Sequence, residues 1–299
     1  MKLNIFVKVT ATVMASVLLT SIGLFLVSNY YARSGFEAEA KENIKLFQTV
    51  VEKGVQGKQQ NILRAASSLS HNPQLVQSLA SGDKAAMRAL MKHQLELFGA
   101  ETAFVTDTKG VILARGHSDE AGDSAMNRKP VADALSGKSS ASIERGKIVK
   151  FALLGAYPIK QGDTVIGSVA LGQGLSGEEF VDETKALTGL EVTIFEGDTR
   201  LSTTIVKEGK RATGTKMDNP KVLETVLQKG QVFLSRNTIL GKAYETAYWP
   251  LRDMQGKVSG MFFIGKDRKI IEDTEDKITW AMFLAATVIS LIMGLGGLW

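Results

Sequence analysis

The chain contains no cysteine among its 299 residues, which excludes disulfides, thiolate metal sites and a cysteine nucleophile. Its three histidines, His71, His93 and His117, lie far apart and outside any metal-binding spacing. The G-x-S-x-G motif of serine hydrolases is absent. Lysine and arginine exceed the acidic residues only mildly and do not form the cluster expected of nucleic-acid-binding proteins. We therefore expect no enzyme, no catalytic residues, no cofactor, no metal and no nucleic-acid partner.

Two stretches carry no charge, Val9–Val27 and Trp280–Trp299. Each is about as long as a helix must be to cross a hydrocarbon core of about 30 Å. Lys2 and Lys8 precede the first stretch, which predicts a cytoplasmic N-terminus. A cleaved signal peptide is the alternative, although it would have a shorter apolar core.

The second stretch has a tryptophan at each end, where an interfacial belt would place it. We expect two membrane spans, with the region between them outside the cytoplasm. The second span would then return the chain to the cytoplasm, where the sequence stops. We interpret the chain as the input half of a longer protein.

A long helix is predicted after the first span, because apolar residues recur at spacings of three, four or seven between Phe36 and Leu69. Over residues 36–70 it would be about 52 Å long. Asn72-Pro73 should end it, and Asp83 should cap a second helix over residues 84–98. The apolar stripe is compatible with packing on the chain's own sheet and with pairing to a second subunit.

The segment from Phe104 to Gly172 is the predicted structural unit. Two β-branched runs flank Asp107-Thr-Lys-Gly110, which predicts a hairpin because glycine tolerates the positive φ of such a turn. A proline-led helix over 130–137 follows, and then further strands. We expect a small antiparallel sheet with helical material on one side.

This unit occurs twice. Four landmarks of the first copy recur 91, 90, 92 and 93 residues later, in the pairs Asp107 and Asp198, Pro130 and Pro220, Pro158 and Pro250, and Gly172 and Gly265. Near-constant spacing with weak identity is typical of an internal duplication.

A dinucleotide-binding pattern, G-x-G-x-x-G, occurs over residues 172–177 and precedes a predicted helix at 178–187. The strands before it alternate and turn tightly, as in antiparallel sheets, whereas the fingerprint belongs to a βαβ crossover. The glycines also lie where a linker between the two copies is needed. We therefore expect no nucleotide site.

Basic side chains along the first copy are the candidate ligand-binding groups. Arg115 and His117 are separated by one residue at the end of the second hairpin strand, so they can share a face. Converging basic groups suit a carboxylate, because charge-assisted bonds are strong. The alternative is that they are exposed charges on edge strands. The imidazolium of His117 would help an anion mainly below a pKa of about 6.5.

Further along, Arg145 and Lys147 precede the third strand and Lys150 lies on it, while Tyr157 is the only tyrosine of this copy. The expected ligand-binding residues are Arg115, His117, Lys150, Arg145 and Tyr157.

Two groups of motifs carry a resemblance. The pattern Asp107-x-x-Gly-x-x-x-Ala-Arg-x-His-Ser, with Gly122-Asp-Ser following, resembles the Cache modules of bacterial chemoreceptors. Gly197-Asp-x-Arg-x-Ser-Thr and Tyr248-x-Pro-Leu-x-Asp, with Gly256-x-Val-x-Gly-Met following, resemble the second module of the fused Cache group. Over about residues 30 to 275 the chain resembles the double-Cache (fused Cache_3–Cache_2-like) sensory region of a methyl-accepting chemotaxis receptor.

The resemblance implies two PAS-like sheets, a homodimer, and a ligand outside the membrane, usually in the membrane-distal module. It implies signalling through the second span to downstream chemotaxis proteins by way of a cytoplasmic region. Citrate-type Cache sensors place an arginine and a histidine close together at this strand, which Arg115 and His117 match. The tyrosine and tryptophan signature of the amino-acid receptors is absent.

We expect an α+β fold with two PAS-like antiparallel-sheet modules on a long N-terminal helix, flanked by two transmembrane helices. Its parts are a tail (1–8), a first span (9–28), a helical stalk (29–98), a distal module (99–178), a proximal module (179–277) and a second span (278–299). The expected function is the periplasmic sensing half of an inner-membrane chemoreceptor, with an organic acid as ligand. The alternatives are the input half of a sensor histidine kinase and a membrane-anchored structural or adhesion module, whose sheet would be closed by large side chains.

Overall fold

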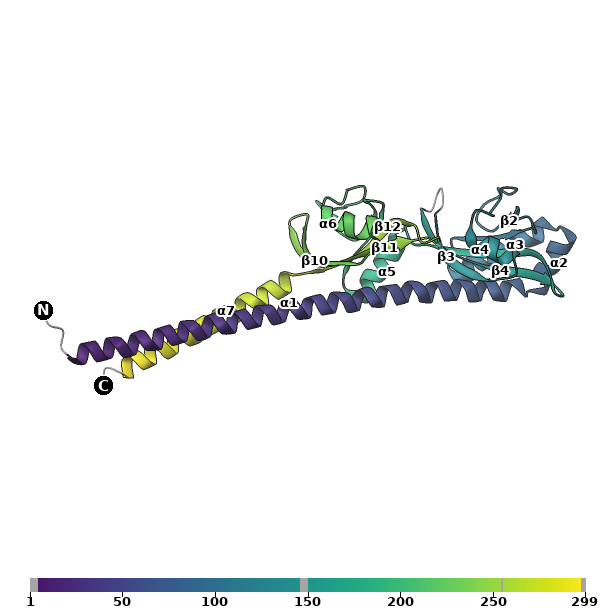
Figure 1. Ribbon diagram of the computed structural model, residues 1–299. Coiled ribbons are helices and arrows are strands. Elements are labelled where there is room, and N and C mark those ends of the chain that lie inside the picture. Colours follow the sequence, from purple (N-terminus) through teal and green to yellow (C-terminus); the bar gives the residue numbers. More distant parts are fainter. Residues whose placement is uncertain (1–4, 146–149, 254, 297–299) are drawn as a thin grey trace. The chain divides into compact units, whose positions relative to one another are not determined.

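The computed structural model describes residues 5–145, 150–253 and 255–296 (Figure 1). Internal contacts divide the chain into two units. One comprises residues 46–234 and 246–265, and the other comprises residues 1–45, 235–245 and 266–299. The part boundaries expected from the sequence stay a prediction.

Three helices come first: α1 (Ile5–Ser70), α2 (Pro73–Ser81) and α3 (Lys84–Phe98). The Asn72 side chain accepts hydrogen bonds from the backbone N–H groups at the start of α2, and Asp83 does the same for α3. Such caps satisfy backbone donors that the first turn leaves free. The predicted break at Asn72-Pro73 and the predicted second helix are both confirmed.

The first sheet has the strand order β2-β1-β5-β4-β3. Its strands are β1 (Thr102–Thr106), β2 (Ile112–Arg115), β3 (Ser140–Arg145), β4 (Phe151–Gln161) and β5 (Thr164–Gly174), and neighbouring strands pair antiparallel. The predicted hairpin joins β1 to β2. The Asp107 carboxylate accepts from the N–H groups of Lys109 and Val111, and Gly110 has a φ of +75°.

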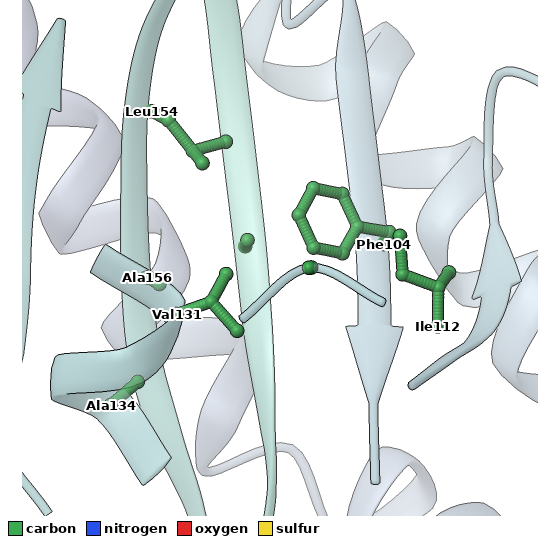
Figure 2. Packing of buried hydrophobic residues seen from close by; sticks show 8 residues of the cluster. Phe104, Ile112, Val131, Ala134, Leu154 and Ala156 are labelled. Atoms are coloured by element: carbon green, nitrogen blue, oxygen red, sulfur yellow. The ribbon is translucent and has the colours of Figure 1, made fainter. Parts of the chain in front are cut away.

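One face of this sheet is covered by the short helix α4 (Lys129–Leu135). Figure 2 shows the Phe104 ring between Leu154 and Ile112, with Val131 and Ala134 of α4 nearby. All of these side chains are buried. They form the apolar core on this side of the sheet.

The helices α1 to α3 pack on the opposite face. A Cβ atom at Gly155 would lie 2.8 Å from Ile62 of α1, and one at Gly167 would lie 2.9 Å from Leu79 of α2. At Gly116, directly after β2, a Cβ atom would lie 2.6 Å from the Met91 backbone of α3. A larger residue at Gly116 would therefore force α3 away from the sheet.

The second sheet has the order β10-β11-β12-β6-β7. Its strands are β6 (Glu191–Glu196), β7 (Thr199–Thr203), β10 (Phe233–Ile239), β11 (Lys242–Arg252) and β12 (Val258–Asp267). The helix α5 (Glu178–Thr188) leads into it, and β8 (Val206–Lys207) pairs with β9 (Lys210–Arg211). The short helix α6 (Pro220–Val222) continues as the π-helix η1 (Leu223–Gln228). Read from β7 to β10, the second sheet has the order β7-β6-β12-β11-β10, which corresponds strand by strand to β2-β1-β5-β4-β3 of the first sheet. This correspondence agrees with the predicted repeat.

The unit that contains both ends of the chain includes α7 (Lys269–Gly296). The ring of Phe25 on α1 meets that of Phe283 on α7 edge-on at 6.4 Å, and Thr279 donates to the Asn29 side chain. In the part of the chain that the structure describes, only a segment within Ala11–Ser70 is long and apolar enough to cross a membrane. The second span stays a prediction, and residues 297–299 lie outside the described residues.

A buried ion pair links β11 to Arg268, the residue between β12 and α7, within the same unit. Arg268 is 1% exposed, and its Nη1 lies 2.7 Å from the Glu245 carboxylate of β11. Its Nη2 lies 3.7 Å from Glu275, and its backbone N–H donates to the Ala243 carbonyl. Because the guanidinium and Glu245 are both buried, each depends on the other for charge compensation.

Candidate functional site

Arg115, at the end of β2, lies in register opposite Phe104 of β1. Its Nη2 donates to both carboxylate oxygens of Asp123 at 2.7 Å, and its Nη1 donates to the Glu120 carbonyl at 2.7 Å. Only 11% of the Arg115 side chain is exposed. Arg115 therefore holds the connection between β2 and α4 (residues 116–128) against the sheet.

Arg128 lies beside Arg115 and was not singled out from the sequence. It directly precedes α4, and its guanidinium lies 5.2 Å from the centroid of the Phe104 ring. Burial lowers the pKa of Arg128, and the nearby charge of Arg115 lowers it further. The available signal was a basic residue directly before a proline-led helix, which by itself does not say which way the side chain points.

Two carboxylates face these arginines. The hydrogen bond from Arg115 holds the pKa of Asp123 below its usual range. Burial raises the pKa of Glu144 on β3, against the opposing effects of a 2.6 Å hydrogen bond from Ser142 and the charge of Arg128. We use the term arginine cluster for Arg115, His117, Asp123, Arg128 and Glu144.

His117 follows β2 and lies against β1. Its ring nitrogens are 3.2 and 3.3 Å from the Thr102 hydroxyl, and Nδ1 accepts from the Ala103 N–H at 3.4 Å. Burial lowers the pKa of His117, and the charge of Arg115 lowers it further. An imidazolium that helps an anion would therefore form at a lower pH than the sequence-based expectation of about 6.5.

The other expected residues lie elsewhere. Arg145 ends β3, makes an ion pair with Glu196 of β6, and places its guanidinium 5.9 Å from the Phe151 ring centroid. Lys150 lies directly before β4 and is partly exposed, and Lys147 is outside the described residues. The structure thus brings Arg115 and His117 together, and it places Arg145 on β3, at the other edge of the sheet from β2.

Tyr157 points away from the arginine cluster. Its neighbour Ala156 belongs to the α4-covered core, and successive side chains of a strand alternate between faces. The Tyr157 ring lies instead 5.9 Å from the ring of His71, which follows α1. Strand alternation predicts that Tyr157 and Ala156 lie on opposite faces of the sheet. The sequence alone does not show which face Ala156 takes.

The second sheet repeats the pairing of a phenylalanine with an arginine. Arg200 of β7 lies in register opposite Phe195 of β6, with its guanidinium 5.2 Å from the ring centroid. Its Nη1 donates to the Thr215 hydroxyl at 2.8 Å, and burial lowers its pKa. Arg200 is buried and packs in the core of its own sheet.

Side-chain size separates the two sheets on the corresponding face. In the first sheet the β5 partners of Phe104 and Thr102 are Ala170 and Gly172. In the second sheet the β12 partners of Phe195 and Thr193 are Met261 and Phe263. The buried Tyr248 ring adds to them, 4.9 Å from the Phe263 ring. The second face is closed by large side chains of its own strands, whereas the first presents small ones beneath α4 and Arg128.

Comparison with known proteins was made for the sequence and for the structure. Residues 173–278 match the family model of single Cache domain 3. No curated protein matches the chain.

Among solved structures, the sensory domain of the Campylobacter jejuni chemoreceptor Tlp3 is 13% identical with a TM-score of 0.50, over 82% of this chain and 98% of that one. The same domain in complex with 4-methylisoleucine gives 13% and 0.50, over 80% and 93%. The sensor domain of the V. cholerae histidine kinase DctB gives 11% and 0.49, over 78% and 98%. Such low identities show the fold alone. Residues 173–278 are thus similar to a single Cache domain, and the chain has the mixed helix and antiparallel-sheet fold of the Tlp3 sensory domain.

Proposed function

We propose that this chain is the extracytoplasmic sensing half of a transmembrane receptor and that it binds a small anionic ligand, an organic acid, at the arginine cluster. Cache sensor domains bind small ligands in chemoreceptors and in histidine kinases.

The observation that carries this proposal is the pairing of Arg115 with Asp123. The guanidinium already donates to both carboxylate oxygens of Asp123 at 2.7 Å. Arg128 lies close enough for the charge of Arg115 to lower the pKa of Arg128. Two adjacent guanidinium groups favour an anion, and arginine binds carboxylates through directional, charge-assisted bonds. A ligand carboxylate would replace Asp123 or bind beside it.

The first sheet suits a ligand better than the second. A structural or adhesion module should have a sheet closed by large side chains, which describes the face formed by Phe195, Tyr248 and Phe263. The face around Phe104 instead presents Ala156, Ala170 and α4. We infer that the ligand enters between this face and the connection 116–128.

The ligand class follows from the same charges. The Tlp3 domain was solved with L-valine and with 4-methylisoleucine, which are amino acids and carry a carboxylate. An amino acid would also need a partner for its ammonium group, and Glu144 is the half-buried carboxylate of the cluster. An organic acid needs only the arginines, so we favour it.

We further propose an inner-membrane protein with two spans, a periplasmic sensor and a homodimer formed along α1. Leu46 and Val50, one turn apart on α1, are 60% and 50% exposed, which suits an apolar contact with a second copy. The signal would pass through α7 to a cytoplasmic chemotaxis region. Because sensor domains of histidine kinases share the fold, a kinase input is the second candidate.

A thermal screen of the full chain in detergent tests the ligand class with organic acids, amino acids and amines. A carboxylate at about 100 times its dissociation constant should stabilise the fold by about 2.7 kcal/mol. Stabilisation by amines alone would contradict an anion site. No stabilisation by any compound would favour the structural module.

A further inference from the structure

A second site is indicated by a cavity of about 300 Å³ that shares no residue with the arginine cluster. It lies where the end of α1 meets α2, β4 and the segment before β3. Its lining includes Ser70, His71, Val76, Ser139, Tyr157 and Lys160. This volume is at the lower end of the range for small-molecule sites, about 300 to 1,000 Å³.

The lining has the chemistry of an anion site. Lys160 and His71 are basic, and Ser70, Ser139 and Tyr157 supply hydroxyl groups. None of the described residues that line the cavity is acidic. An anion bound here would therefore meet donors on several sides and no like charge, whereas a cation would have no carboxylate to compensate it.

Hydrogen bonds within the lining decide which atoms remain available. Nδ1 of His71 lies 2.7 Å from the Ser67 carbonyl oxygen, which can only accept, so Nδ1 carries the hydrogen. The Ser70 hydroxyl donates to the same carbonyl at 2.7 Å. Nε2 of the neutral His71 ring then carries only a lone pair, and the Ser70 hydroxyl has already donated its hydrogen. The donors left for an anion are therefore Lys160, Ser139 and Tyr157, while the Tyr157 ring packs against the imidazole at 5.9 Å.

We propose that this cavity binds a small carboxylate, with Lys160 and the Tyr157 hydroxyl as donors to the anion and Val76 in contact with its short apolar part. The ligand would link the end of α1 to β4, because His71 follows α1 and Tyr157 and Lys160 lie on β4. This site is independent of the arginine cluster and goes beyond the proposed function.

Propionate is a suitable probe, because it combines a carboxylate with a short apolar part. Its binding to the full chain in deuterated detergent can be followed by ligand-detected NMR titration, with 1-propanol as a neutral control of similar size. Lys160→Gln should weaken propionate binding at this site by about tenfold or more, since it removes a charge-assisted bond. Tyr157→Phe should weaken it less, and Ser139→Leu should block it by filling space.

Lys138→Gln is the matched control. It removes the same charge next to Ser139, but Lys138 does not line the cavity, so affinity should stay unchanged. The titrations are run in the Arg115→Ala background as well, which removes the affinity of the arginine cluster for carboxylates, so that the remaining propionate binding reports on the cavity. Circular dichroism checks that every variant is folded.

The proposal would be overturned by propanol binding as tightly as propionate, by equal losses for Lys160→Gln and Lys138→Gln, or by no propionate binding at all. Loss of all binding in Arg115→Ala would also overturn it, while supporting the arginine cluster as the ligand site.

Discussion

Arg115 has a structural role in the described chain, and in our proposal it is also the residue that binds the ligand. Its contacts to Asp123 and Glu120 hold the connection 116–128, so replacing it should affect the order of this segment as well as ligand affinity. A lost ligand contact must be separated from lost order in residues 116–128, which requires a control that disturbs the same segment without Arg115. Arg88 provides this control, because it makes a 2.6 Å ion pair with Asp119 of that segment.

At the same scale, His117 should make stability depend on pH. Its pKa is lowered in the folded state, chiefly by burial, so the unfolded chain binds the proton first as pH falls below about 6.5. Stability should therefore fall with pH from about 6.5 down to the folded pKa. His117→Gln should flatten the change in melting temperature between pH 7.5 and pH 5.5.

His93, exposed on α3, is the control for this experiment. His93→Gln should keep the pH dependence of the wild-type chain. An unchanged slope in His117→Gln would show that other groups set the pH dependence in this range.

The sequence placed Arg115 and His117 together because strand alternation puts residues two apart on one face, and the structure has them close together. The sequence could not identify Arg128, because the path of the connection 116–128 depends on tertiary contacts such as the one between Arg115 and Asp123. Arg145 was grouped with the site for its charge, yet its partner Glu196 comes from another sheet. Charge alone does not reveal such a distant partner.

At the scale of the elements, local sequence signals were sufficient to predict the helix starts and the first hairpin turn. Asn72, Asp83 and the turn after Asp107 were predicted because each acts on backbone groups within four residues of itself. The second sheet was harder, since β8 and β9 and the π-helical turn after α6 have no strong local pattern. Their conformation is set by packing that the sequence does not display.

The junction of β12 with α7 gives a prediction at this scale. Arg268→Ala would leave Glu245 as an uncompensated buried charge, so it should lower stability by about 3–5 kcal/mol. Combining Arg268→Met with Glu245→Gln should recover part of the loss, because both charges then disappear. Chemical denaturation of the full chain measures both effects.

Arg236→Ala is the control at the exposed ion pair with Glu37, and it should cost about 1 kcal/mol or less. If Arg268→Ala costs no more than Arg236→Ala, the buried pair does not hold the junction together.

At the scale of the whole molecule, constant spacing of landmarks predicted the repeat because insertions within a sheet unit are restricted by strand pairing. The difference in side-chain size between the two copies was not predicted, although alanines and a glycine in one copy stand where the other has Met261, Phe263 and Tyr248. Aligning the copies by strand register, rather than by proline and glycine landmarks, would have revealed it. The register itself required the structure.

Dimer formation is the prediction at this scale. Replacing both Leu46 and Val50 by glutamate should shift the detergent-solubilised chain towards monomer, because charges would replace the exposed apolar side chains of α1. Light scattering after size-exclusion chromatography measures the mass. Gln56→Glu, also exposed on α1, should have no effect, and an unchanged dimer in the double variant would exclude this contact.

The most direct test of the central claim is calorimetric titration of the strongest carboxylate from the thermal screen into the wild type, Arg115→Ala, Arg115→Lys and Arg88→Ala. Arg115→Ala should lose about 1.5–3 kcal/mol of binding, or about 10- to 150-fold in affinity, since it removes a charge-assisted bond. Arg115→Lys should fall between it and the wild type, because lysine keeps the charge without the fork. Arg88→Ala should bind as the wild type does. Equal losses in Arg115→Ala and Arg88→Ala, or none in either, would contradict a ligand site at the arginine cluster.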